Sequence, residues 1–174
     1  MSADHEIAID VEFDGQNLLS IALVPLSGSN SLYLVAEHGE IKDEWVRENV
    51  IPRLMTERAK YARPVPMDWI RREVAHYLRL VESATGKRPR IIADWWQDII
   101  RLLRLIDHGD GTCEDVPDLD FSVRQKIGQP TRFPLVCMDD AELPRPGSNP
   151  ILIPHNALDD AKAIALALRK EREK

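Results

Sequence analysis

Cysteine is scarce in this sequence, and its two copies, Cys113 and Cys137, do not form a C-x-x-C motif. A disulfide framework or a cysteine zinc site is therefore not expected. No apolar run approaches the ~18 residues of a membrane span, and residues 1–6 lack the basic and apolar regions of a secretory signal. We therefore expect a cytoplasmic protein with reduced thiols and no membrane partner.

Positive charge is not in excess either: 23 Lys and Arg stand against 29 Asp and Glu, which gives a formal net charge of −6. The total charge therefore offers no argument for nucleic-acid binding, although local basic patches and an acidic metal site are compatible with it. With 44% hydrophobic and 30% charged residues, the composition is typical of a globular chain. A length of 174 residues predicts a single domain, residues 1–174, with a substantial core.

The first part of the chain has the pattern of strands and the rest mainly that of helices. Turn-rich residues separate three early strands closely enough to predict an antiparallel meander. The expected strands are residues 7–13, 18–26, 31–36 and 90–93, and the expected helices are residues 43–49, 68–83, 95–106, 118–126 and 157–169. Residues 129–154 contain six prolines and are expected to form a loop. The predicted fold is α/β, with helices packed on a central mixed sheet that combines the meander with parallel strands.

Two acids interrupt the first predicted strand. Asp10 and Glu12 are two residues apart in Ile7-Ala8-Ile9-Asp10-Val11-Glu12-Phe13, so they point to the same face of the strand. Neighbouring carboxylates on a buried element repel each other and are costly to desolvate, and Mg²⁺ or Mn²⁺ would offset that cost. The alternative is an edge strand whose polar face meets solvent.

Two further acids follow the strand at residues 90–93. Asp94 and Asp98 are four residues apart, so within a helix they share a face with Arg101. Asp94 would serve as the N-cap of the following helix, and Asp98 as a first-turn acid or as a partner of Arg101. Either residue is also a candidate cation ligand, and the spacing from the strand at residues 90–93 favours Asp98 over Asp94.

The last predicted helix begins with a polar residue and two acids. Asn156 is a good N-cap, and Asp159 occupies the N3 position, where an acid stabilises the helix start. Asp160 has no such role: it shares a face with Ala157, Ala161 and other apolar residues that must pack on the sheet. A carboxylate on a packing face is costly unless it is paired or binds a metal. His155 lies at the opening of the same site.

The order of these elements resembles the DEDDh group of 3′–5′ exonucleases, which have the ribonuclease-H-like fold. Asp-x-Glu on the first strand, an Asp after a short mid-chain strand, and the motif His155-Asn-Ala-Leu-Asp-Asp160 carry the resemblance, which extends from Ile7 to Leu168. Short relatives described as bacterial 3′–5′ exoribonucleases look most similar.

The resemblance implies roles for five residues. Asp10, Glu12, Asp98 and Asp160 would bind two divalent cations, Mg²⁺ or Mn²⁺, and His155 would act as the general base. The second motif departs from the family, because Asp94 stands where relatives have Asn, so Asp94 is an alternative to Asp98 as the ligand. The implied reaction is hydrolysis of phosphodiester bonds from the 3′ end, with release of nucleoside 5′-monophosphates.

The segment after the first motif is expected to contact the terminal nucleotide, because relatives contact it there. The candidates are Phe13, Gly15 and Leu18, with Trp95 as a further stacking residue. Core packing is the alternative for Phe13 and Trp95. Three basic residues, Arg124, Lys126 and Arg132, are candidates for phosphate contacts.

We therefore expect a metal-dependent 3′–5′ exonuclease, and the resemblance implies RNA more than DNA as the nucleic acid bound. The alternatives are a non-catalytic nucleic-acid-binding module with the same fold and a small nucleotide phosphohydrolase. A homodimer is a further expectation, with the helix at residues 68–83 or the proline-rich segment as its interface.

Overall fold

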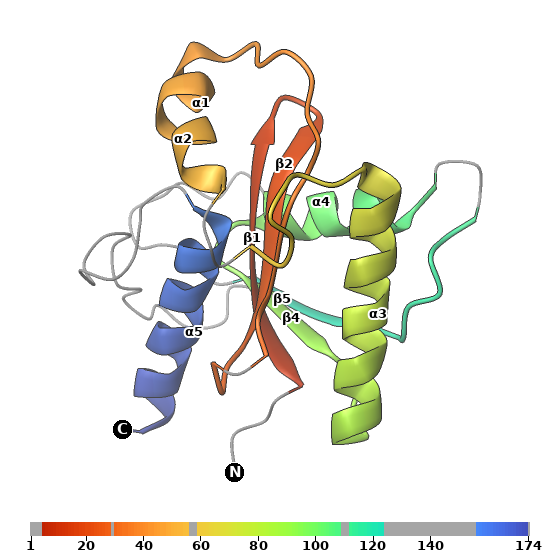
Figure 1. Cartoon of the computed structure of the whole chain (residues 1–174). Helices are drawn as coiled ribbons and strands as arrows, with labels where there is room; N and C mark the ends of the chain where they lie inside the picture. Colours follow the sequence, from red (N-terminus) through yellow and green to blue (C-terminus); the bar gives the residue numbers. More distant parts are fainter. Residues whose placement is uncertain (1–4, 29, 56–58, 109–111, 124–155, 174) are drawn as a thin grey trace.

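A five-stranded mixed sheet lies at the centre of the structure, in the order β3-β2-β1-β4-β5 (Figure 1). The computed structural model describes residues 5–28, 30–55, 59–108, 112–123 and 156–173. The strands are β1 (Glu6–Asp14), β2 (Asn17–Pro25), β3 (Leu32–Val35), β4 (Arg90–Ala93) and β5 (Asp120–Val123). The first three form the expected antiparallel meander, and β4 pairs in parallel with both β1 and β5. The predicted α/β class with a mixed sheet is confirmed.

Helices cover both faces of this sheet. They are α1 (Glu44–Asn49), α2 (Ile51–Leu54), α3 (Met67–Thr85), α4 (Trp96–Ile106) and α5 (Ala157–Arg172). Helices α3 and α4 pack on one face, and α5 packs on the other, where α1 and α2 extend the apolar core (Figure 1). Within the described residues, none of the helices has the length and apolar character that a membrane crossing needs.

Local sequence explains most element boundaries. Residues Ile7, Ile9 and Val11 of β1 join the core beneath α3 and α4, while Ala8 joins the core beneath α5, as the two-residue period of a strand requires. Helix α3 ends at Gly86, whose backbone is left-handed (φ 63°) and whose N–H donates to the Glu82 carbonyl at 2.7 Å. That geometry favours glycine.

One element was predicted wrongly. The segment expected as a helix at residues 118–126 contains strand β5, and residues 124–126 lie outside the described residues. Phe121 pairs with Ile91 and Val123 with Ala93 in a parallel ladder. Aromatic and β-branched residues favour strands, and the free edge of β4 offers backbone partners that helical periodicity does not reveal.

The short helix α2 was not predicted at all. It follows α1 directly, with Pro52 in its first turn. Proline fits there, because the first N–H groups of a helix need no partner within it. The proline-rich segment at residues 129–154 lies outside the described residues.

Strand β1 is central, so the alternative of a solvent-facing edge strand is wrong. Its pairing with β4, however, extends only from Glu6 to Ala8. Strand β4 ends at Ala93, and the chain then turns into α4, while β1 continues to Asp14. The carboxyl ends of parallel strands are where α/β sheets bind ligands. Asp10 and Glu12 lie at this end.

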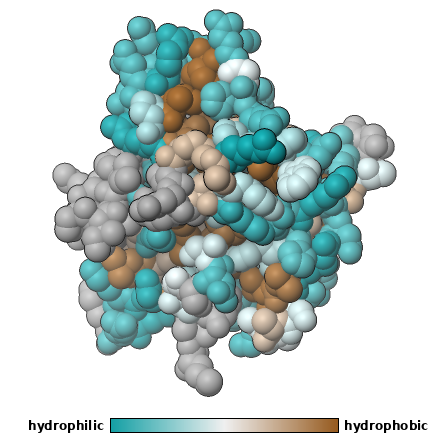
Figure 2. Space-filling model, viewed as in Figure 1, coloured by the Kyte–Doolittle hydropathy of each residue, from teal (hydrophilic) through white to brown (hydrophobic). Residues whose placement is uncertain are grey.

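The opposite end of β1 carries another acid. Glu6 is buried and forms ion pairs with Arg90, at 3.5 Å, and with Arg172 near the end of α5. These contacts join β1, β4 and α5 at the end of the sheet away from Asp10. Figure 2 shows that the viewed face is mainly hydrophilic, with hydrophobic areas over α1 and α2 and along the lower half of α3.

Candidate metal centre

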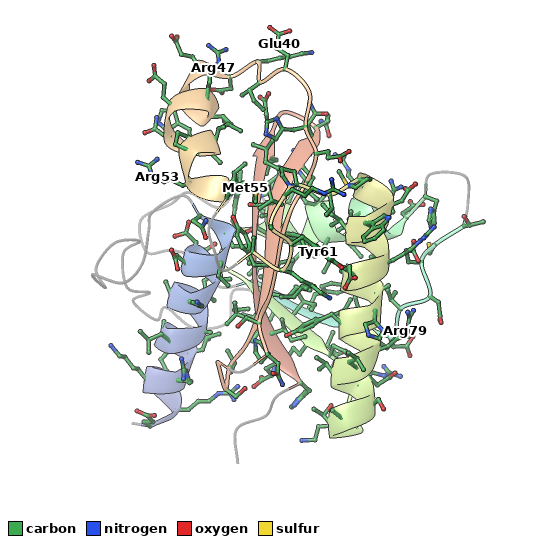
Figure 3. The ribbon with its side chains drawn as sticks, in the orientation of Figure 1. Glu40, Arg47, Arg53, Met55, Tyr61 and Arg79 are labelled. Carbon is green, nitrogen blue, oxygen red and sulfur yellow. The ribbon has the colours of Figure 1, made fainter. Side chains whose placement is uncertain are left out.

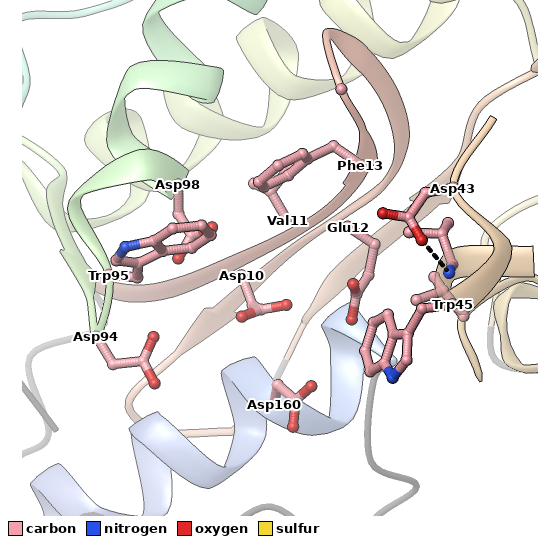
Figure 4. Close-up of a pocket in the computed structure, with 13 residues that line it drawn as sticks. Asp10, Val11, Glu12, Phe13, Asp43, Trp45, Asp94, Trp95, Asp98 and Asp160 are labelled. Carbon is pink, nitrogen blue, oxygen red and sulfur yellow. Dashed lines mark hydrogen bonds between the residues drawn. The ribbon is translucent and has the colours of Figure 1, made fainter. Parts of the chain in front are cut away.

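A cleft of about 520 Å³ lies beyond the carboxyl end of β4 (Figure 4). Strand β1, helix α1, the β4–α4 junction and helix α5 each contribute residues to it. We call it the acidic cleft, because six carboxylates line it: Asp10, Glu12, Asp43, Asp94, Asp98 and Asp160. Asp43 has a separate task, since its side chain accepts a hydrogen bond from the Val46 N–H at 3.2 Å and caps α1.

Asp10, Glu12 and Asp160 form one group within the cleft. Each offers a carboxylate oxygen, and these oxygens lie within 4.8 Å of one another. Strand geometry directs Asp10 and Glu12 to the same side, and α5 brings Asp160 against them (Figure 4). The sequence-based grouping of these three residues therefore corresponds to their arrangement in space.

Helix α5 is held in place by its first residues. The Asn156 side chain accepts from the Leu158 N–H at 3.2 Å, while its Nδ2 donates to the Tyr33 hydroxyl at 3.0 Å and to the Arg53 carbonyl at 2.6 Å. The predicted N-cap is thus confirmed, and its side chain also fastens the helix start to β3 and α2. Asp160, in the first turn, is directed toward β1 by this anchoring.

Asp10, Asp94 and Asp98 form a second group with the same 4.8 Å limit. Asp98 lies in the first turn of α4 and is 1% exposed, whereas Asp94 precedes the helix and is half-buried. The N-cap position belongs to Trp95, so the interpretation of Asp94 as the N-cap is wrong. Both Asp94 and Asp98 therefore remain candidates for a ligand role.

The electrostatics of the cleft centre on Asp10. Burial raises the pKa of the Asp10 carboxyl well above its ordinary value, and the negative charges of Asp98, Glu12, Asp160 and Asp94, in that order, raise it further. Charged carboxylates this close are unfavourable unless positive charge is supplied.

The chemistry of this donor set fits a hard divalent cation. All five ligand candidates are carboxylates, which suit Mg²⁺ and Mn²⁺, and neither group contains the Cys or His ligands typical of zinc. Asp10 belongs to both groups, an arrangement in which one carboxylate can bridge two cations.

An aromatic and cationic stack borders the acidic cleft. The Phe13 and Trp95 rings are stacked with centroids 5.8 Å apart, and the Arg101 guanidinium lies 4.1 Å from the Phe13 centroid. A register shift between Glu12 and Phe13 interrupts the strict alternation of β1. Phe13 packs on the core and also lines the cleft, and its contact with a nucleotide stays a prediction.

The predicted nucleotide-contacting residues divide into two sets. Gly15 and Trp95 line the acidic cleft, and Gly15 adopts a left-handed conformation (φ 60°) in the β1–β2 turn. Leu18 does not line it. Its side chain is buried in the core beside Phe13, with which it pairs across the hairpin, and it borders a neighbouring pocket.

Trp45 is a cleft residue that the sequence analysis missed. It is 51% exposed and stands opposite Trp95 across the carboxylates (Figure 4). A signal existed in the sequence: Trp45 is a large aromatic residue in a short segment of mostly charged and polar residues, residues 43–49.

Several predicted residues lie outside the described residues: His155, Arg124, Lys126 and Arg132. His155 directly precedes the N-cap Asn156 in the sequence. Comparison of the sequence with models of known protein families, and with curated proteins, gave no match.

Proposed function

We propose that this protein is a metal-dependent 3′–5′ exonuclease of the DEDDh type, with a ribonuclease-H-like fold. The main support is the meeting of five carboxylates from β1, the β4–α4 junction and α5 in one cleft, in two groups that share Asp10. The mixed sheet with its N-terminal meander and flanking helices is compatible with that fold.

Each group of carboxylates would hold one cation. Asp10, Glu12 and Asp160 would bind the first, and Asp10 with Asp98 the second, with Asp94 as the alternative ligand. Such cations lower the pKa of a bound water and stabilise negative charge on a phosphodiester and its leaving oxygen. Helix α5 and the first turn of α4 would keep the carboxylates in position before any cation binds, which reduces the reorganisation required.

The remaining residues of the cleft would position the substrate. Trp45 and Trp95 offer exposed ring faces on which bases can stack, and such stacking accepts any base. His155 is proposed as the general base, since an imidazole with a pKa near ~6.5 accepts a proton close to neutral pH. RNA is proposed over DNA from the sequence resemblance alone.

The test is digestion of a 5′-labelled single-stranded RNA, and of the matching DNA, with Mg²⁺ or Mn²⁺. We expect a ladder that shortens from the 3′ end and releases nucleoside 5′-monophosphates, and the preferred sugar would show as the faster ladder. EDTA and Asp10→Ala should both abolish it.

Asp118→Ala is the matched control, because Asp118 is an exposed acid near the start of β5, far from the cleft. It should cleave as the wild type does. If neither polymer nor a duplex with a 3′ overhang is cut, the proposal is wrong. Hydrolysis of mononucleotides would then favour a nucleotide phosphohydrolase, and binding without cleavage a non-catalytic module.

A further inference from the structure

A second pocket, of about 480 Å³, adjoins the acidic cleft. It lies between the β1–β2 turn, the segment at residues 37–42, the start of α3 and the exposed side of α4. Its charged residues are mostly basic: Lys42, Arg71, Arg101 and Arg104, against Glu37 and Glu40. We call it the basic pocket. Figure 3 gives the position of Glu40, above the β1–β2 hairpin.

The two arginines from α4 are held in place by neutral oxygens. Arg101 donates to the Gly15 carbonyl at 2.6 Å and to the Gln16 side-chain oxygen at 3.3 Å, and Arg104 donates to the same Gln16 oxygen at 2.7 Å. Within the described part of the chain, neither guanidinium forms an ion pair with a carboxylate, whereas Arg71 pairs with Asp68 at 2.7 Å. Two neighbouring cations held by neutral oxygens can bind an external anion.

The pKa of Arg101 is consistent with this crowding. Burial and then the charge of Arg104 lower it, although Asp98 opposes the shift. The guanidinium nevertheless stays protonated at neutral pH, because arginine is the most basic side chain.

Residues that are neighbours in sequence or in contact line the basic pocket and the acidic cleft. On one side, the stack of Trp95, Phe13 and Arg101 begins in the cleft and ends in the pocket. On the other, Asp43 lines the cleft while its neighbour Lys42 lines the pocket. The Asp14 carboxylate accepts the backbone N–H of Lys42 at 2.7 Å and so fixes this segment to the hairpin.

We propose that the basic pocket binds backbone phosphates of a single nucleic-acid strand whose 3′ end lies in the acidic cleft. This inference rests on the proposed function, because the acidic cleft defines where the strand ends. Arginine suits the role, since its planar donors match phosphate oxygens and its plane stacks on aromatic rings and bases. The aromatic stack between the two sites would carry a base, and phosphates further toward the 5′ end would reach Arg104 and Lys42.

The experiment is fluorescence anisotropy in EDTA, which prevents cleavage, with 5′-labelled oligouridylates of two lengths, a dinucleotide and a strand of about eight nucleotides. The variants are Arg104→Gln, Lys42→Gln and the double variant, all at exposed positions. Arg88→Gln is the matched control: it removes one exposed arginine beside the start of β4, at the far end of the sheet.

We expect the double variant to bind the longer strand about tenfold more weakly than the wild type does. The slope of log affinity against log salt should fall by about 1.4, since each phosphate contact with a single strand contributes about 0.7. Binding of the dinucleotide, and every property of Arg88→Gln, should be unchanged. Arg104→Glu should weaken binding of the longer strand further. Circular dichroism would verify that each variant is folded.

The two proposals can fail separately. If the double variant binds the longer strand with wild-type affinity and salt slope while the protein still produces a 3′ ladder, the pocket proposal is wrong and the exonuclease proposal stands. If no ladder forms but length-dependent binding is lost in the double variant, the pocket proposal stands and the catalytic one is wrong. Absence of any binding by the wild type would overturn the pocket proposal.

Discussion

The acidic side chains at the two ends of strand β1 have opposite kinds of neighbours. Glu6, Asp10 and Glu12 lie at even positions and share the face that packs toward α5. Glu6 is buried with two arginines as partners, Arg90 and Arg172. Asp10 and Glu12 instead meet the carboxylates of Asp94, Asp98 and Asp160. Among the described residues, the acid at one end of β1 is paired with two arginines, whereas the acids in the cleft are grouped with one another.

The largest expected effect comes from Asp10→Asn, because this carboxylate belongs to both groups. We expect strand cleavage to slow by on the order of 10³-fold or more. Binding of Mn²⁺, measured by isothermal titration calorimetry, should be lost as well. Asp118→Asn is the control. A fully active Asp10→Asn protein would contradict the metal-binding role inferred for the cleft end of β1.

Variants that damage only one of the two carboxylate groups should give the next largest effect. Asp160→Asn damages one group and Asp98→Asn the other, so each should lower the number of bound Mn²⁺ ions from two to one. Cleavage should slow by on the order of 10²-fold in each case, since the two cations act together on the phosphodiester. Retention of both ions in either variant would remove that residue from the ligand set.

Asp94→Asn should have a smaller effect than Asp98→Asn. Asp98 is fixed in the first turn of α4 and is almost fully buried, while Asp94 lies on the bend before the helix. We expect about a tenfold loss of cleavage rate for Asp94→Asn, the lower range for an outer ligand. A larger loss of cleavage rate in Asp94→Asn than in Asp98→Asn, measured under the same conditions, would identify Asp94 as the second-motif ligand.

Glu6→Gln tests the other end of the strand. It removes two ion pairs in which Glu6 is 6% exposed and its arginine partners are 35% and 49% exposed. We expect urea denaturation to show a loss of about 1–2 kcal/mol in unfolding free energy. The cleavage rate of the folded protein should be unchanged; a loss of cleavage without a loss of stability would contradict the division of roles.

The smallest effect is the pH dependence of stability without metal. The pKa of Asp10 is raised in the folded protein, so between the ordinary value and the raised value the folded state binds more protons than the unfolded state. The Asp10 contribution to unfolding free energy therefore falls as pH rises through this window and is lowest above the raised pKa. Melting curves in EDTA should show this decline, and Asp10→Asn should reduce it. An unchanged pH dependence in the variant would contradict the assignment.

The acids of the candidate site could be predicted where the charge of a residue disagreed with the hydrophobic pattern of its strand or helix. Asp10 and Glu12 were found because strand period and hydrophobic pattern disagreed with their charge, and Asp160 because it occupies the packing face of α5. Asp94 and Asp98 were found by helical spacing, but spacing could not separate them, since the bend at Trp95 and the burial of Asp98 depend on tertiary structure.

The remainder depends on partners that a local pattern does not contain. Strand β5 forms because β4 has a free edge, which the sequence of residues 120–123 alone does not reveal. Leu18 was placed beside the nucleotide by its position after the turn, yet core packing holds it elsewhere. Trp45 reaches the cleft only because α1 and α2 fold over the end of the sheet.

The anchoring of α5 also determines when the cleft is completed. Asp10 and Glu12 leave the ribosome long before Asp160 and its anchor Asn156, which follow them far along the chain. Contacts this distant in sequence form late, after most of the sheet has assembled. A nascent chain that lacks docked α5 thus has an incomplete carboxylate cluster. The order of synthesis therefore separates the formation of β1 from the completion of the carboxylate cluster.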